Sequence, residues 1–129
     1  MSSYQFSQRS ETALLGVHPD LIQLARSALS LSSVDFGVTE GLRSMAREKE
    51  MVAEGHSQTL HSRHLTGHAI DVVAYVNGTV SWNWSLYKQI AAAFKQASAS
   101  LGIPVEWGGN WQTLKDGEHF QLPWAAYPA

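Results

Sequence analysis

Two segments that carry histidine and aspartate, far apart in the sequence, constrain most strongly what this 129-residue chain can fold into. Residues 62–71 read SRHLTGHAID, and residues 116–121 read DGEHFQ. Together they offer two histidines and one carboxylate as metal ligands, with a second carboxylate to handle protons. Catalytic zinc sites commonly use three protein ligands and leave a fourth position for water. A fold that brings the two segments together would therefore create a site suited to a zinc hydrolase.

The composition is that of an ordinary globular chain without cysteine. Hydrophobic residues make up 44% and charged residues 16%, and the length suits one catalytic domain over residues 1–129. Without cysteine, any metal must be bound by His, Asp or Glu. The net charge of −2 gives no footprint for nucleic acid. No apolar run approaches the roughly 20 residues of a membrane span, and the N-terminus lacks the pattern of a signal peptide. We expect a monomer without stable membrane association.

The pattern of apolar and turn-forming residues predicts helices mixed with antiparallel strands. Pro19 suits a first helical position, and Asn77-Gly78 is a strong signal for a two-residue hairpin. The predicted helices are residues 19–29, 44–54 and 84–101, and the predicted strands are residues 34–38, 69–76, 79–82, 105–107 and 120–122. No βαβ regularity is present, so the predicted class is α+β. We expect a small antiparallel sheet flanked by helices, with the metal site at the sheet.

Asp71 and His64 are candidate ligands from the first segment. Asp71 interrupts an apolar strand, where an unpaired buried carboxylate is costly, and coordination of a metal would offset that cost. Taken alone, Asp71 is better explained by exposure on an edge strand or by pairing with Arg43. His64 lies in the loop that feeds this strand, but histidine content alone cannot select it. Its rivals are His18, His56, His61 and His68.

His119 and Asp116 are the candidates from the second segment. Asp116 lies three residues before His119, across Gly117, so its carboxylate could reach water on a metal held by His119 and act as general base. Glu118 competes for this role, although in a regular strand it would point away from the face of His119. An ordinary turn also explains the pair Asp116-Gly117.

Arg43 follows the strand predicted at residues 34–38, within the stretch Gly41-Leu42-Arg43-Ser44. An arginine at this position could bind a substrate carboxylate or stabilise an oxyanion. More often, such an arginine is a surface or ion-pair residue.

The two segments resemble the motifs of the zinc D,D-carboxypeptidase and L-alanyl-D-glutamate endopeptidase family, which hydrolyses peptidoglycan peptides. The family pattern S-x-H-x-x-G-x-A-x-D is met at Ser62, His64, Gly67, Ala69 and Asp71, and the later D-x-x-H element is met at Asp116 and His119. Residues 16–21 and the loop Trp107-Gly108-Gly109 look like the phage endolysin branch. The resemblance spans nearly the whole chain.

This resemblance implies a set of roles. The implied Zn²⁺ ligands are His64, Asp71 and His119. The implied catalytic base is Asp116, and the arginine element of the family places Arg43 at the substrate carbonyl. Ser62 and Trp107, which lie in the matched motifs, are candidates for substrate binding.

The function expected from the resemblance is that of a phage endolysin, a zinc hydrolase that cuts the L-Ala-D-Glu bond of peptidoglycan and causes host lysis. One alternative is a D-Ala-D-Ala carboxypeptidase or dipeptidase on the same scaffold. Another is a non-enzymatic binding module that keeps zinc for structure, although a structural site has no use for the base Asp116. Without a signal peptide, the protein would stay in the host cytoplasm until a holin-type lesion releases it to the cell wall.

Overall fold

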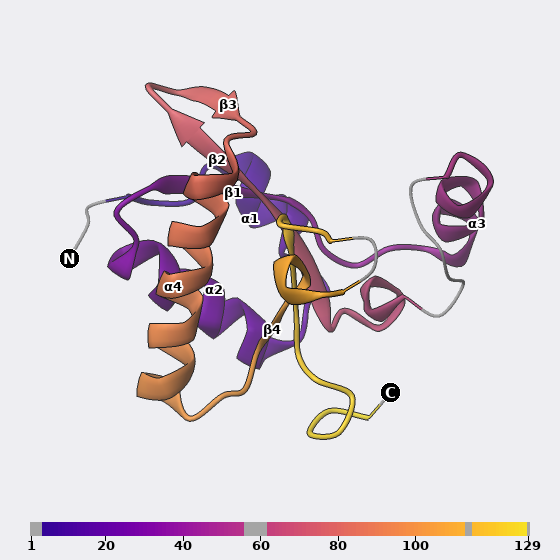
Figure 1. Ribbon diagram of the computed structural model, residues 1–129. Coiled ribbons are helices and arrows are strands. Elements are labelled where there is room, and N and C mark those ends of the chain that lie inside the picture. Colours follow the sequence, from indigo (N-terminus) through magenta and orange to yellow (C-terminus); the bar gives the residue numbers. More distant parts are fainter. Residues whose placement is uncertain (1–3, 56–61, 113–114, 129) are drawn as a thin grey trace.

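The computed structural model describes residues 4–55, 62–112 and 115–128 (Figure 1). His56 and His61, two of the rival histidines, lie outside the described residues. In chain order the helices are α1 (Gln8–Ala13), α2 (Pro19–Leu31), α3 (Met45–Ala53) and α4 (Trp84–Leu101). The strands are β1 (Asp35–Glu40), β2 (Ala69–Val76), β3 (Thr79–Ser81), β4 (Glu106–Trp107) and β5 (His119–Gln121), and two 3-10 turns are η1 (Arg63–Thr66) and η2 (Gly108–Asn110).

The sheet is antiparallel and has the order β1-β2-β5-β4, with β3 paired to β2. Strand β2 lies between β1 and β5, so β2 and β5 are neighbours although they are far apart in the sequence. Their register places Asp71 directly opposite His119. The predicted α+β class with a small antiparallel sheet is therefore confirmed, and the sheet is what joins the two metal-ligand segments.

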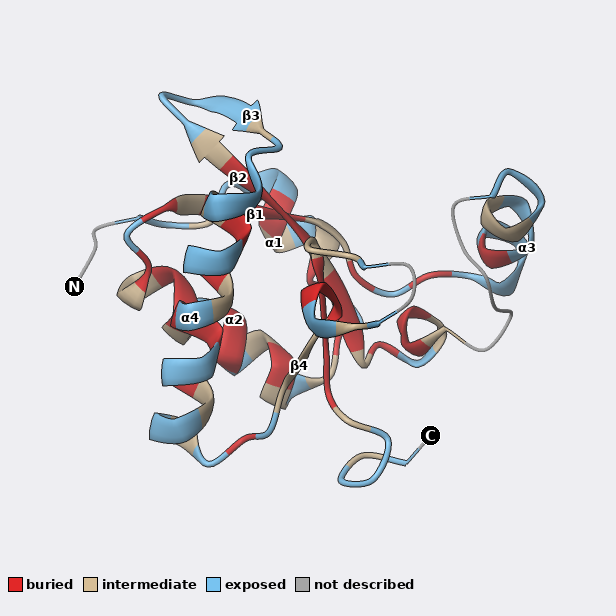
Figure 2. Cartoon of the chain, in the orientation of Figure 1, coloured by how far each residue is buried: buried red, intermediate tan, exposed pale blue. Residues whose placement is uncertain are grey.

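The core lies between the sheet and the pair α2 and α4, which pack together beside it (Figure 1). Because side chains alternate along a strand, Ile70 and Val72 enter this core while Asp71 points to the other face. Figure 2 shows buried residues gathered along the sheet and on the inner sides of the two helices, whereas α3 stands apart. None of the described helices is long and apolar enough to cross a membrane.

Local sequence signals explain several boundaries. Pro19 occupies the first turn of α2, and Ser44 caps α3 by accepting a hydrogen bond from the amide of Arg47. The hairpin turn has φ of 52° at Asn77 and 78° at Gly78, as a type I′ turn requires. Strand β2 and helix α4 have the predicted bounds.

Several predicted bounds differ from the observed ones by one or two residues, and two differences concern β1 and its neighbour α1. Helix α1 is not expected from the sequence, because its six residues are mostly polar. Ser7 caps the helix, and the buried Ser10 hydroxyl accepts a hydrogen bond from the amide of Val38. A contact of this polar kind leaves no pattern of apolar residues in the sequence. Strand β1 runs beyond residue 38 to Glu40, because β1 stays paired with β2 through an irregularity that places Glu40 opposite Asp71.

Candidate active site

Three elements bring His64, Asp71 and His119 together. Asp71 and His119 face each other across β2 and β5. His64 lies in η1, which begins where the Ser62 hydroxyl accepts a hydrogen bond from the His64 amide and ends at Gly67, with φ of 74°. Only glycine fits at Gly67, because an added Cβ would lie 2.4 Å from the carbonyl oxygen of Gly16.

The potential ligand atoms of these three residues converge. They all lie within 4.8 Å of one another. Asp71 Oδ1 is 3.3 Å from His64 Nε2 and 3.4 Å from His119 Nδ1. His64 Nε2 and Asp71 Oδ1 are buried and have no hydrogen-bond partner among the described residues. Buried polar atoms are rarely left without a partner, so this pair fits a cation held between them.

In each imidazole one nitrogen, here called the inner one, faces Asp71: Nε2 in His64 and Nδ1 in His119. The other nitrogen, the outer one, has a hydrogen-bond partner away from Asp71. His64 Nδ1 lies 2.9 Å from the carbonyl oxygen of Gly41, which can only accept. His119 Nε2 lies 2.7 Å from Gln121 Oε1. The Gln121 side-chain nitrogen donates to a Glu106 carboxylate oxygen at 3.2 Å, and this bond turns the amide oxygen of Gln121 toward His119. Both outer nitrogens therefore carry the proton, and both inner nitrogens present a lone pair, as metal-binding histidines do.

The donor set of two imidazoles and one carboxylate suits zinc. Burial raises the pKa of Asp71, but the adjacent imidazoles of His119 and His64 lower it by more, so that it lies well below its usual range. Burial lowers the pKa of His119, whereas the adjacent Asp71 carboxylate raises it, and the net pKa lies above the usual one. A carboxylate that stays ionised among imidazoles is prepared to bind a cation. The group could therefore hold a metal ion.

Two further carboxylates lie near this group, on the turn that precedes β5. Burial and the charge of Asp71 raise the pKa of Asp116. Burial and the charges of Asp71 and Asp116 raise the pKa of Glu118 to about 7. Asp116 Oδ1 accepts a hydrogen bond from the Glu118 amide at 3.3 Å, which orients its carboxylate. Because β5 begins at His119, Glu118 belongs to the turn, and the argument from strand alternation does not apply to it.

Arg43 is buried and lies beside the site. Its Nε and Nη1 bond to Glu40 and Glu48 at 2.7 and 2.6 Å, and its Nη2 lies 3.9 Å from Asp71 Oδ2. The backbone amide of Arg43 also donates to the His64 carbonyl at 2.9 Å. The structure thus places Arg43 in an ion-pair network that includes Asp71, with one guanidinium nitrogen directed to the site.

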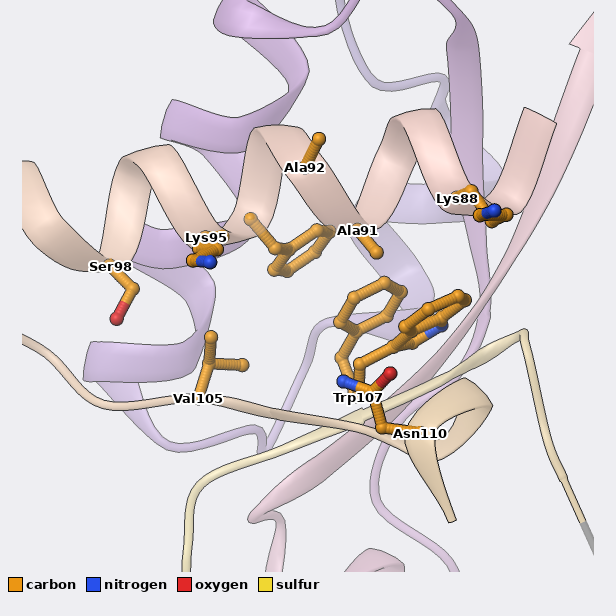
Figure 3. A pocket seen from close by; sticks show the side chains of 10 residues that line it. Lys88, Ala91, Ala92, Lys95, Ser98, Val105, Trp107 and Asn110 are labelled. Atoms are coloured by element: carbon orange, nitrogen blue, oxygen red, sulfur yellow. The ribbon is translucent and has the colours of Figure 1, made fainter. Parts of the chain in front are cut away.

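Ser62 and Trp107, the two candidates for substrate binding, have structural contacts of their own. The Ser62 hydroxyl caps η1. Trp107 donates from Nε1 to the Gly117 carbonyl at 2.8 Å and lines a groove of about 420 Å³ beside α4, together with Phe94, Lys88, Lys95 and Asn110 (Figure 3). His64, Asp71 and His119 are not among the described residues that line this groove.

Two rival histidines lie elsewhere. His68 Nδ1 is 2.6 Å from the Thr66 hydroxyl, and its ring lies 5.4 Å from that of His18. Neither belongs to the converging group found within the described part of the chain. Sequence reasoning missed Gln121 and Glu106, which orient His119. The spacing of Gln121, two residues after His119 on the same strand, was a usable signal because such residues share a face.

Comparison with known proteins identifies the family of the chain. Residues 1–121 match the family described as phage L-alanyl-D-glutamate peptidase. The L-alanyl-D-glutamate peptidase of Escherichia phage T5 is 38% identical over 122 residues, which cover 88% of this chain and 86% of the relative. The protein of the same name from Listeria phage A118 is 31% identical over 98% of this chain, which spans 45% of that relative. The crystal structure of the Serratia marcescens L-Ala D-Glu endopeptidase ChiX superposes with a TM-score of 0.92 at 59% identity, and the match covers 98% of this chain and 96% of that one. The chain belongs to the family of phage L-alanyl-D-glutamate peptidases.

Proposed function

We propose that this protein is a zinc-dependent endolysin that hydrolyses the L-Ala-D-Glu bond of bacterial peptidoglycan. Its relatives are named for this activity, so membership of the family makes the chain a peptidoglycan hydrolase. The observation that carries the proposal for zinc is the convergence of His64, Asp71 and His119 on a buried point where two polar atoms lack partners among the described residues. The catalytic domain would comprise residues 1–129.

In this proposal His64 binds through Nε2, His119 through Nδ1 and Asp71 through a carboxylate oxygen. When bound, zinc polarises the scissile carbonyl and lowers the pKa of a water. Asp116 accepts the proton of the attacking water and returns it to the departing amine. The hydrogen bond from the Glu118 amide orients the Asp116 carboxylate for this proton transfer, and a positioned general base typically contributes about 10²–10⁴-fold in rate.

Arg43 would face the substrate carbonyl through Nη2, because Nε and Nη1 are held by Glu40 and Glu48. The same ion pairs fix the guanidinium, and a fixed charge stabilises a developing oxyanion without reorganising. We propose Trp107 as the substrate-binding residue at the groove beside α4. For Ser62 we propose a contribution to substrate binding through the position of the η1 turn that it caps.

The substrate partner is peptidoglycan, and we propose that the chain works as a monomer. We also propose that it passes from the host cytoplasm to the cell wall through a holin-type lesion.

Digestion of Gram-negative sacculi, with metal content measured on the same purified sample, tests the proposal. We expect one zinc per chain and peptides with a new N-terminal D-Glu, with L-Ala left on the muramic acid. Free D-Ala as the sole product would establish a carboxypeptidase instead. Bound zinc with no product would indicate a binding module.

A further inference from the structure

Two tryptophans hold the turn that carries Asp116. The Nε1 of Trp107 donates to the carbonyl oxygen of Gly117 at 2.8 Å. The ring of Trp84, the first residue of α4, packs against the same glycine from another element. The two indoles stack with centroids 5.5 Å apart and an interplanar angle of 27°. Gly117 is therefore fixed by a hydrogen bond and by a ring, both from outside its own turn.

The identity of Gly117 follows from this contact. A Cβ added there would lie 2.7 Å from Trp84 Cζ3 and 3.3 Å from Cε3. Gly117 is not among the described glycines with positive φ, so its backbone can be adopted by any residue. Glycine is needed at this position for space against Trp84, not for backbone freedom.

The turn is also held by backbone hydrogen bonds. The Asp116 amide donates to the Gly108 carbonyl at 3.0 Å, the His119 amide to the Asp116 carbonyl at 3.2 Å, and the Val72 amide to the Glu118 carbonyl at 2.8 Å. Trp84 remains 44% exposed, so the ring that contacts Gly117 lies at the surface of the protein. Its backbone is fixed because Asn83 caps α4 at the residue before it. The ring that packs against Gly117 is thus anchored to a long, well-packed helix.

We propose that Trp84 and Trp107 are positioning residues that clamp the turn at Gly117 and so set the place of the Asp116 carboxylate beside the ligand group. This inference rests on the proposed role of Asp116 as base. Displacement of a catalytic group by about 1 Å can cost roughly 10²-fold in rate. Loss of the clamp should lower kcat and leave zinc binding nearly unchanged. In Trp84→Leu, which alters no proposed substrate contact, KM should also stay nearly unchanged.

Trp107→Phe tests the hydrogen bond, because it keeps an aromatic ring and removes the N–H. We expect kcat on sacculi to fall about tenfold or more, with wild-type zinc content. Trp82→Leu is the control, because Trp82 is 64% exposed and its ring stacks on Tyr87. Wild-type kcat in Trp107→Phe, or an equal loss in Trp82→Leu, would overturn the inference.

Gly117→Ala tests the space argument, and the double variant Gly117→Ala with Trp84→Leu keeps the test decisive if the single variant folds poorly. The shorter side chain makes room for the new Cβ, so the double variant should recover thermal stability relative to Gly117→Ala, while its kcat stays below wild type because the ring is gone. Equal stability of the two would refute the clash. If added zinc restored kcat in these variants, the two tryptophans would act on the proposed zinc ligand His119 and not on Asp116, and the inference would be overturned. An inactive wild-type protein would refute the proposed function, which none of these variant comparisons can do.

Discussion

Replacing Gln121 with leucine should weaken zinc binding although Gln121 is not itself a ligand. The side chain accepts from His119 Nε2 at 2.7 Å, and both residues are only 6% exposed, so water cannot easily replace the lost partner. A leucine side chain at this position would leave a buried N–H unpaired, at a cost of about 1–3 kcal/mol. The imidazole can escape part of that cost by moving its proton to Nδ1, the nitrogen proposed to bind the metal.

That cost corresponds to about 5- to 150-fold in zinc affinity, in line with the roughly 10- to 100-fold effect of removing the outer hydrogen bond of a metal-binding histidine. Competition with a chromophoric chelator measures the affinity. Nitrogen-15 NMR of the metal-free protein reports the tautomer and should show a greater share of proton on Nδ1 of His119 in the variant. Glu106→Gln is the matched control, because the Gln121 oxygen can still accept from His119, and its effect should be smaller. A zinc affinity of Gln121→Leu within threefold of wild type, with an unchanged tautomer, would refute the reasoning.

Three other changes separate the metal, the base and the scaffold. His64→Ala should abolish stoichiometric zinc and lysis; full zinc content in that variant would remove His64 from the ligand set and bring His68 forward. Asp116→Asn should keep the fold and the zinc but lose about 10²–10⁴-fold in kcat, and near wild-type activity beside an inactive Glu118→Gln would move the role of base to Glu118. Arg63→Ala should lower the free energy of unfolding, measured in urea, by about 2–4 kcal/mol. The reason is that the guanidinium donates to the Leu122 and Tyr127 carbonyls and lies 4.1 Å from the centre of the Trp124 ring. A decrease below about 0.5 kcal/mol would contradict this explanation.

The elements predicted best were those with long, periodic patterns or specific turn chemistry. Strand β2, the Asn77-Gly78 turn and helix α4 have their predicted bounds, because burial, turn geometry and helix periodicity all agree there. Helix α1 carries no such pattern in its six residues. The extension of β1 to Glu40 depends on pairing with β2, and pairing between distant strands has no local signal.

The candidate site was predictable in its residue types but not in its supports. The motifs indicated His64, Asp71 and His119, and the β2–β5 register explains why the last two meet. The sequence left open whether Asp71 pairs with Arg43 or binds a metal, and the structure places it against both Arg43 and the two imidazoles. The orientation of Gln121 by Glu106 depends on a register that only the folded sheet supplies.

His64 is supported differently from the other two converging residues, and this difference involves the unexpected helix α1. Asp71 and His119 sit on paired strands against the core, whereas the imidazole of His64 is oriented by the carbonyl oxygen of Gly41. Gly41 in turn lies so close to α1 that an added Cβ would be 2.2 Å from the Ala13 carbonyl oxygen. Any larger residue at Gly41 would have to push α1 away or shift the carbonyl that orients His64. The contact between α1 and the end of β1 therefore sets the direction of one proposed metal ligand, and disturbance of that contact should change zinc affinity before it changes the sheet.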